Sequence, residues 1–297
     1  MNTVRIIPRL DVKGPNLVKG IHLEGLRVLG KPERFARYYY ENGADELIYM
    51  DVVASLYGRN SLTEIIERTS KEIFIPLTVG GGLRTIDDIR TVLRAGADKV
   101  SLNTAAINNP QLIKEASRRF GSSTILISIE AIKNPDGAYE AYTDNGREKT
   151  GVEVFEWAKR VEELGAGEIM VTSINQEGTG AGFDLELTRR IAEAVSIPVI
   201  ACGGAGAVSH IYNVIAQGSA DAVSIASILH YNFIKHYSLE VGTTRFRDDF
   251  SDEGNIEFLK KKVEFSKIQD STITEIKQYL IDKRINCRYS MAESAYA

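Results

Sequence analysis

Two acidic residues end short apolar segments that occupy corresponding places in the two halves of the chain. Asp11 closes the segment 6–10, and Glu130 closes the segment 127–129. Two carboxylates that face each other across a substrate can act as general acid and general base. A single acid in such a place is more often a solvated strand-end residue, so the prediction of catalysis depends on the pair. Asp51 ends a further apolar segment and is predicted to support Asp11.

Glycine-rich turns are duplicated in the same way. Residues 80–82 are three glycines before a predicted helix at 86, and residues 203–206 contain three glycines before a predicted helix at 208. Backbone N–H groups in such turns, together with a helix N-terminus, bind phosphate well. The predicted binding residues are Gly82, Asn103 and Thr104 in one half, and Gly204, Ala226 and Ser227 in the other. Any tight strand–helix turn uses glycine, but the duplication predicts two phosphate sites at opposite ends of one elongated substrate.

A long connection, residues 12–30, follows the first predicted strand. It carries Lys13 and Lys19 among several glycines. One interpretation is a mobile lid that brings Lys19 to an anionic substrate. The other is a plain surface loop, and the residues alone leave both open.

Four charged residues lie at the opposite ends of the predicted strands. They are Arg5, Glu46, Lys99 and Glu168. Counting along each strand places all four near one level, where alternating charges could form a closed ring of ion pairs. The other interpretation is that these charges, at the end of the barrel that we call its floor, are merely solvated or salt-bridged.

Apolar segments rich in Val and Ile alternate with amphipathic helical patterns along the chain. The predicted strands are 4–10, 46–51, 73–79, 99–103, 124–130, 168–173, 197–201 and 221–226, and the predicted helices are 33–42, 61–71, 86–95, 110–119, 153–164, 184–195 and 208–217. This alternation is typical of parallel strand–helix–strand units. Eight such strands indicate an α/β fold, a closed (β/α)₈ TIM barrel, with a doubly wound open sheet as the main rival.

An internal repeat favours the barrel. The segments 43–48 and 165–170 match at an offset of 122 residues, and so do the turns 79–82 and 201–204. The segments 97–101 and 220–224 match at an offset of 123. We therefore predict two half-barrels, about 1–122 and 123–230, within one domain that spans 1–297. Two separate small domains would need a linker near 119–124, and none is visible there.

Residues 231–270 break the repeat with a charged and aromatic stretch, before a predicted final helix at 273–283. We interpret 231–270 as an insertion on the barrel rim. A solvated loop with one short helix and a contact with a partner are both open interpretations.

Composition narrows the function classes. The chain has 297 residues, a net charge of −4 and only two cysteines, Cys202 and Cys287, neither in a metal or redox spacing. These values argue against a general nucleic-acid or membrane-surface binder and against a disulfide framework. No apolar run approaches the roughly 20 residues of a membrane helix, and the start lacks a signal-peptide pattern. We expect a cytoplasmic protein.

Several segments together resemble one family, the synthase (cyclase) subunit of imidazole glycerol phosphate synthase, called HisF. They are IIPRLDVKGPNLVKG (6–20), GADELIYMDVVAS (43–55), PLTVGGGLRT (76–85), GADKVSLNTAAINNP (96–110), GAGEIMVTSINQEGTGAGFD (165–184) and IPVIACGGAG (197–206). The resemblance covers about 4–230 and resumes at about 273–288.

The resemblance implies a partner and a reaction. HisF works with a HisH-like glutaminase, whose ammonia passes along the barrel axis to convert a bisphosphorylated aminoimidazole-carboxamide ribonucleotide derivative (PRFAR) into imidazole glycerol phosphate and AICAR. No metal or organic cofactor is implied. Asp11 and Glu130 match the family's two catalytic acids, and Lys19 matches its mobile-loop lysine. The residues that match the ammonia entrance are Arg5, Glu46, Lys99 and Glu168, and Asp98 matches a glutaminase contact.

This chain departs from the family in its reaction chamber. The second catalytic acid is Glu130 instead of Asp, and Arg9 stands where the family has a small residue. Where the family reads Asp-x-Asp-Gly, residues 175–178 read Asn-Gln-Glu-Gly, with Glu177 as a supporting acid and Gly178 at the second phosphate site. The changes resemble second-copy HisF paralogues found with surface-polysaccharide genes, which are thought to supply ammonia to a sugar amidotransferase.

Three hypotheses follow. The preferred one is such a paralogue, which delivers ammonia for amidation of a surface-polysaccharide sugar. The alternatives are an authentic histidine-pathway cyclase and a barrel that only docks and activates a glutaminase. The related isomerase of the same pathway shares the half-barrel plan, but it does not need the ring at the strand N-termini, so it ranks below these.

Overall fold

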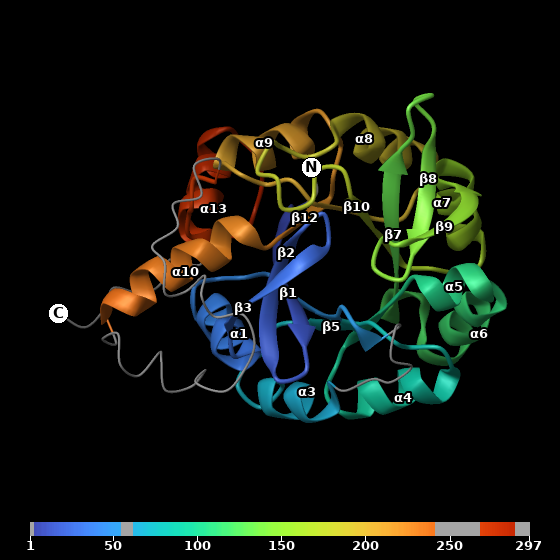
Figure 1. The fold of residues 1–297 in the computed structure, drawn as a ribbon, viewed down its shortest axis with the longest axis horizontal. Helices are drawn as coiled ribbons and strands as arrows, with labels where there is room; N and C mark the ends of the chain where they lie inside the picture. The colour runs from blue at the N-terminus through green and yellow to red at the C-terminus, as the bar shows by residue number, and fades with distance from the viewer. Residues whose placement is uncertain (1–2, 55–61, 241–267, 289–297) are drawn as a thin grey trace.

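The computed structural model describes residues 3–54, 62–240 and 268–288 (Figure 1). Eight parallel strands close into a barrel. In barrel order they are β1 (Arg5–Lys13), β4 (Leu47–Asp51), β5 (Leu77–Gly80), β6 (Lys99–Leu102), β7 (Ile125–Lys133), β10 (Glu168–Ser173), β11 (Val199–Cys202) and β12 (Ala222–Ile225). Because β10 pairs with β7 and β12 pairs with β1, no edge of this barrel stays open. The TIM barrel is confirmed and the open sheet is excluded.

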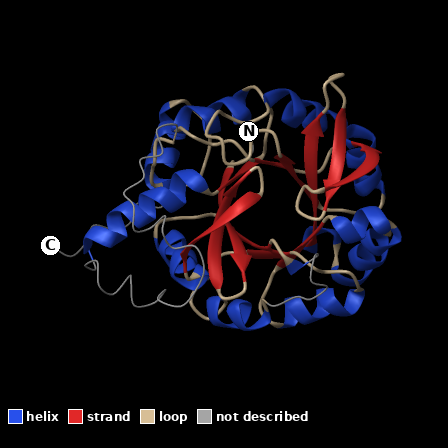
Figure 2. Cartoon of the chain, in the orientation of Figure 1, coloured by secondary structure: helices blue, strands red, loops and turns tan. Residues whose placement is uncertain are grey.

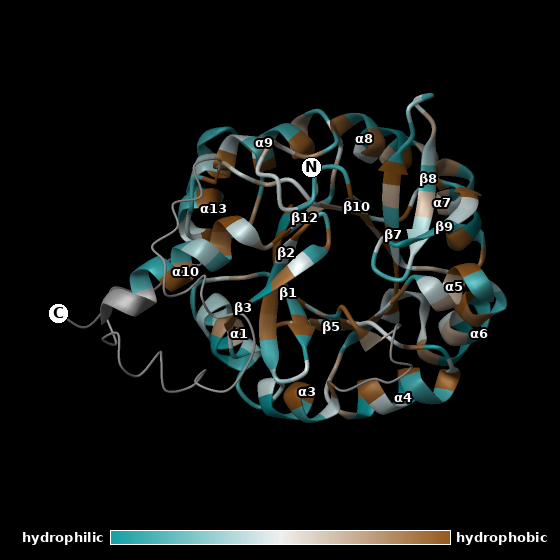
Figure 3. Cartoon of the chain, in the orientation of Figure 1, coloured by the Kyte–Doolittle hydropathy of each residue, from teal (hydrophilic) through white to brown (hydrophobic). Residues whose placement is uncertain are grey.

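Helices surround the barrel, as Figure 2 shows. They include α1 (Pro32–Glu41), α3 (Thr63–Thr69), α4 (Ile86–Arg94), α6 (Gln111–Phe120), α7 (Val154–Glu163), α8 (Leu185–Ala194) and α9 (Val208–Ala216). Their apolar faces pack on the outer side of the strands and form one hydrophobic core. A second, smaller apolar cluster fills the barrel interior and includes Ile7, Ile48, Leu126, Met170 and Ile200. Figure 3 shows the hydrophobic residues gathered on the strands and on the inward sides of the helices.

The two glycine turns have the same geometry. Gly81 and Gly82 have φ values of 95° and 69°, and Gly203 and Gly204 have values of 88° and 109°. A Cβ atom on Gly81 would lie 2.2 Å from the backbone oxygen of Asp51. The left-handed backbone and this close approach both require glycine. The sequence repeat is therefore also a repeat of turn geometry.

Two hairpins stand at corresponding positions of the two halves. After β1 the chain forms the antiparallel strands β2 (Asn16–Ile21) and β3 (Glu24–Gly30). After β7 it forms β8 (Tyr139–Thr143) and β9 (Glu148–Glu153). The expectation of a loop over residues 12–30 was wrong, because the buried side chains of Leu17, Val18 and Leu29 anchor a hairpin.

One predicted strand began too early. Residues 73–79 were expected to be extended, but β5 begins only at Leu77. Phe74 is 79% exposed, so the apolar letters before Pro76 do not all face a core. The short helix α5 (Thr104–Asn108) was not predicted.

The C-terminal segment closes the fold beside the N-terminus. The helix α10 (Ser227–Glu240) covers the start of the predicted 231–270 insertion, whose residues 241–267 lie outside the described part. The helix α13 (Ile273–Asp282) packs against α9, where a helix over 273–283 is predicted. The Nζ atom of Lys277 forms an ion pair with Oδ1 of Asp45 at 2.7 Å. The backbones of Val4 and Cys287 form an isolated parallel β-bridge. No helix in the described ranges is long and apolar enough to cross a membrane.

Candidate active site

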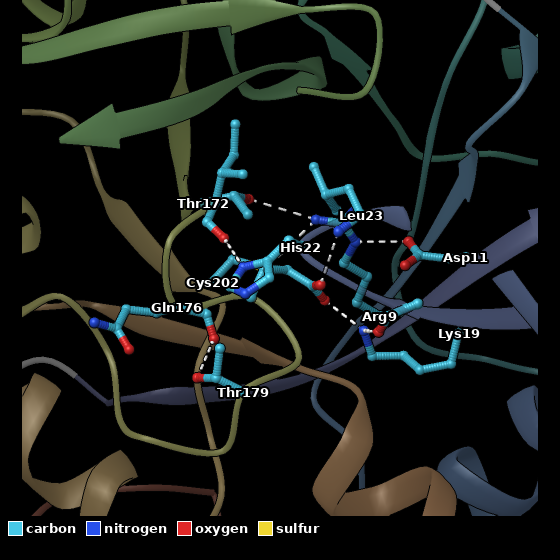
Figure 4. Close-up of polar contacts among 12 residues, drawn as sticks. Arg9, Asp11, Lys19, His22, Leu23, Thr172, Gln176, Thr179 and Cys202 are labelled. Carbon is cyan, nitrogen blue, oxygen red and sulfur yellow. Dashed lines mark hydrogen bonds and ion pairs between the residues drawn. The ribbon is translucent and has the colours of Figure 1, made fainter. Parts of the chain in front are cut away.

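Arg9 and Asp11 are alternate residues of β1 and form a buried ion pair. The Nε atom of Arg9 donates to Oδ1 of Asp11 at 2.8 Å. Nη1 of Arg9 reaches Thr172 Oγ1 at 3.4 Å and Cys202 Sγ at 3.5 Å (Figure 4). Thr172 lies on β10 and Cys202 on β11, so the guanidinium extends from β1 across the interior of the second half. Among the described residues, Nη2 of Arg9 has no hydrogen-bond partner.

Glu130 lies on β7, four strands from β1 in barrel order. Its side chain is buried, and its Oε2 atom has no hydrogen-bond partner in the described part of the chain. Burial raises the pKa of Glu130 to about 7, although the charge of Arg9 and the N–H of Gly146 act in the opposite direction. A carboxyl group with a pKa near neutrality can both hold and release a proton under working conditions.

The hairpin β2–β3 is fastened to the loop that follows β10. The Nζ atom of Lys19 forms an ion pair with the carboxylate of Glu177, and the backbone N–H of Leu23 donates to the same carboxylate at 3.2 Å. The backbone of His22 donates to the backbone oxygen of Glu177 at 3.0 Å, and its ring contacts Ile174 (Figure 4). Lys19 is 3% exposed, so it is not a residue of a plain surface loop.

The predicted phosphate-binding residues fall into two separate pockets. Gly82, Asn103 and Thr104 line the pocket of the first half, together with Asp51 and Glu130. The pocket of the second half is lined by Gly178, Gly204, Ala226 and Ser227, together with Arg9, Lys19 and Glu177. The structure thus brings each predicted set together. Both pockets also contain charged residues, and we call the two pockets together with Asp11 the chamber.

Asp51, which is predicted to support Asp11, lines the first pocket. Its Oδ1 atom accepts from the backbone N–H of Val53 at 3.1 Å, which stabilises its own turn. We therefore place Asp51 with the first pocket, while Glu177 belongs to the second.

Several lining residues were not predicted. Arg84 and Asn145 line the first pocket, and Ser224 lines the second. Arg84 follows the glycine turn by two residues, and this proximity is a signal that could have identified it. Asn145 comes from the β8–β9 turn, with φ of 58°, and could not be placed without that hairpin.

The four charges at the other end of the barrel form a closed ring. Glu46 accepts from Arg5 at 2.7 Å and from Lys99 at 3.0 Å. Glu168 is paired with Arg5 and, at 3.1 Å, with Lys99. The interpretation of a merely solvated floor is wrong, because each charge contacts two of opposite sign.

Asp98 has a structural task that recurs around the barrel. Its Oδ2 atom accepts from the backbone N–H of Leu77 at 2.9 Å. Asp45 and Asp221 accept in the same way from Ile6 at 2.8 Å and Val199 at 2.9 Å. Asp98 is nevertheless exposed and lines a shallow pocket with Phe74, so it also lies on a surface open to a partner.

Comparison with known proteins places this geometry in a family. The family model described as "Histidine biosynthesis protein" matches residues 5–235. The chain is 60% identical over 206 residues to the imidazole glycerol phosphate synthase subunit HisF of Legionella pneumophila, which is 69% of this chain and 97% of that protein. It is 49% identical over 232 residues to the HisF subunit of Alkaliphilus metalliredigens, covering 78% and 92% of the two chains.

The similarity extends to an archaeal relative. The HisF subunit of Methanocaldococcus jannaschii is 47% identical over 259 residues, covering 81% of this chain and 94% of its own. The residues matched by the family model, 5–235, include the barrel strands, both glycine turns and the four charges of the ring. The chain therefore belongs to the HisF family, the synthase subunits of imidazole glycerol phosphate synthase.

Proposed function

We propose that this chain is the cyclase subunit of a cytoplasmic glutamine amidotransferase complex. It takes ammonia from a HisH-like glutaminase and converts PRFAR into imidazole glycerol phosphate and AICAR. The observation that carries the proposal is the position of two buried carboxylates: Glu130 lines the pocket of the first half, and Asp11 pairs with Arg9, which lines the pocket of the second half. The similarity to relatives named as HisF supports it.

The two acids suit different steps. Incorporation of ammonia requires one group that removes a proton from the attacking nitrogen and another that protonates the leaving atom. Glu130 has a pKa of about 7, and its Oε2 atom has no hydrogen-bond partner among the described residues, so it is suited to donate the proton. Asp11 forms an ion pair with the guanidinium of Arg9 and is suited to accept one.

The floor provides the entrance. In this proposal, the ring of Arg5, Glu46, Lys99 and Glu168 admits ammonia from the glutaminase, which docks on the surface that holds Asp98. Phe74 adds an exposed aromatic side chain to that surface and forms an edge contact with Tyr40 at 6.0 Å. Aromatic side chains such as that of Phe74 are enriched in protein–protein contacts.

A second candidate function is favoured by the chemistry of the chamber. Arg9 is tied to Asp11, and Glu130 places its carboxylate one methylene further from the backbone than aspartate would. A shift of this size can reduce turnover of the original substrate. The barrel would then deliver ammonia to a sugar amidotransferase for a surface polysaccharide. A non-catalytic barrel that activates a glutaminase is the remaining candidate.

Turnover of PRFAR by the purified barrel, with an ammonium salt at high pH, tests the proposal. Loss of PRFAR absorbance that disappears in Asp11→Asn would support a working cyclase. Absence of turnover from a folded protein that still activates a glutaminase would contradict it and favour ammonia delivery to another acceptor. The exposed Arg37→Gln variant on α1 serves as the control, because Arg37 pairs only with Glu41 on the outer surface in the contacts described.

A further inference from the structure

We propose that Arg9 is a specificity-determining, substrate-binding residue, whose guanidinium binds an oxyanion of a phosphate monoester in the pocket of the second half. This inference deepens the proposed function, since it rests on the chamber binding a substrate phosphorylated at both ends. It adds Arg9 to the predicted phosphate-binding residues of that pocket, which are Gly178, Gly204, Ala226 and Ser227.

Arg9 is held in place with one donor nitrogen left over. Asp11 engages Nε, while Thr172 and Cys202 engage Nη1, so the plane of the guanidinium is held by contacts on three strands. Nη2 is buried and has no hydrogen-bond partner in the described residues, and Arg9 as a whole is only 3% exposed. A buried donor without a partner is unfavourable unless a ligand supplies the acceptor.

A second unpartnered atom lies in the same pocket. Ser224 also lines the pocket, and its buried Oγ atom lacks a hydrogen-bond partner among the described residues. Ser224 is on β12, the neighbour of β1, and pairs with Ile7 in the parallel register. Two unsatisfied donors beside the backbone of Gly204 and Ala226 fit a ligand with several acceptor oxygens, as phosphate has.

The charges of the pocket favour an anion. Its carboxylate, Glu177, is already paired with Lys19, and the nearby Asp11 is already paired with Arg9. Burial is the largest single influence and lowers the pKa of Arg9, but the interactions with Asp11, Cys202 and Glu177 together outweigh it, and the net direction is upward. Arg9 therefore remains a cation, and its fork geometry matches the oxygens of phosphate.

Arg9 also makes the two pockets different. Asp11 and Glu130 occupy equivalent strands of the two halves, and the residue two positions before each is Arg9 in one case and Ser128 in the other. The pocket of the second half therefore has a fixed cation contributed by β1, whereas the equivalent position of β7 is a serine that does not line the pocket of the first half. We infer that this difference selects which end of an elongated bisphosphate enters each half.

Binding of inorganic phosphate to the whole chain, followed by calorimetry and ³¹P NMR, tests the inference. The native protein should bind phosphate at two sites. Arg9→Gln should weaken one of them by about tenfold to a hundredfold, because a charge-assisted hydrogen bond is lost. Arg9→Lys should retain part of the affinity, and Ser224→Ala should weaken the same site by a smaller factor. Arg37→Gln, on the outer surface, should change neither site.

Unchanged affinity at both sites in folded Arg9→Gln would overturn the inference, and so would a change confined to the site that Thr104→Val affects. If Arg9→Gln fails to fold, the phosphate affinities of Ser224→Ala and Arg9→Lys are compared instead, because both variants keep the pocket nearly the same size. Native affinity at both sites in both variants would overturn the inference. If PRFAR is turned over at the native rate and the phosphate affinity does not change when Arg9 is substituted, only this inference is contradicted. Phosphate binding that depends on Arg9 without any turnover would contradict only the proposed reaction.

Discussion

The ring at the floor of the barrel and the group of Arg9, Asp11 and Glu130 at its other end both consist of buried or half-buried charges, but their polar atoms are paired to different extents. At the floor, each of the four ring residues contacts two of opposite sign, so the charges satisfy one another. In the chamber, Arg9 and Glu130 each keep a polar atom without a hydrogen-bond partner among the described residues. A closed network stabilises a structure, whereas an incomplete one is tolerated where a ligand completes it.

The cost of the incomplete chamber supports this interpretation. A buried polar atom without a partner costs about 1–3 kcal/mol, which is a substantial part of the stability of a domain. The interior apolar cluster lies between the two levels and keeps them apart. In this barrel, charge alone therefore does not mark a functional site. A buried charged group with an atom that lacks a hydrogen-bond partner does.

Removing a chamber carboxylate should have the largest effect. Asp11→Asn or Glu130→Gln should lower PRFAR turnover with saturating ammonium by about 10²–10⁴, because proton transfer in the transition state is lost. The rate of PRFAR loss measures this, with the melting curve as a check of folding. Turnover within a factor of two of the native protein would reject the residue as an essential acid or base.

Opening the floor should affect stability and coupling instead of chemistry. Glu46→Ala or Lys99→Ala leaves like charges facing each other and should cost about 3 kcal/mol of unfolding free energy. In the complex with a glutaminase, more glutamine should be hydrolysed for each product formed, while turnover with added ammonium should stay nearly native. An unchanged ratio of hydrolysis to product would remove the ring from the ammonia route.

The raised pKa of Glu130 should make stability depend on pH. In the folded state the pKa is about 7 and in the unfolded chain about 4.5, so the protonated folded form is favoured. This contribution is complete below pH 4.5 and is lost as pH rises from 4.5 through 7, a change on the order of 3 kcal/mol. Comparison of thermal unfolding of the native protein and Glu130→Gln across this window measures it. Parallel pH curves for the two proteins would contradict the shift.

Releasing the hairpin should have the smallest effect. Glu177→Gln removes the charge that holds Lys19 and weakens the contact between the β2–β3 hairpin and the loop after β10. We expect faster amide exchange in residues 16–30 and a KM for PRFAR raised by about tenfold, with kcat less affected. Glu186→Gln, which pairs with Lys133 at the exposed rim, is the matched control. Native exchange in the hairpin of Glu177→Gln would show that this ion pair does not hold it.

The barrel, the repeat and most of the candidate-site residues could be predicted from the residue pattern. Eight apolar segments at regular spacing require a parallel sheet covered by helices, and glycines at an offset of 122 residues require the same turn twice. The ring charges could be placed because each lies at the start of a strand. The hairpins were missed, since their short alternating segments, such as residues 16–21, are weak signals beside the glycines that flank them.

Which polar groups have hydrogen-bond partners, in contrast, followed only from the three-dimensional arrangement of the strands. Arg9 reaches Thr172 and Cys202, which lie 163 and 193 residues further along the chain. The pKa of Glu130 and the grouping of turn residues into two pockets likewise depend on burial and on distances between strands. Residue type and order reveal which groups can do chemistry, but hydrogen-bond satisfaction and desolvation act over a few ångströms in space, and barrel closure sets those distances.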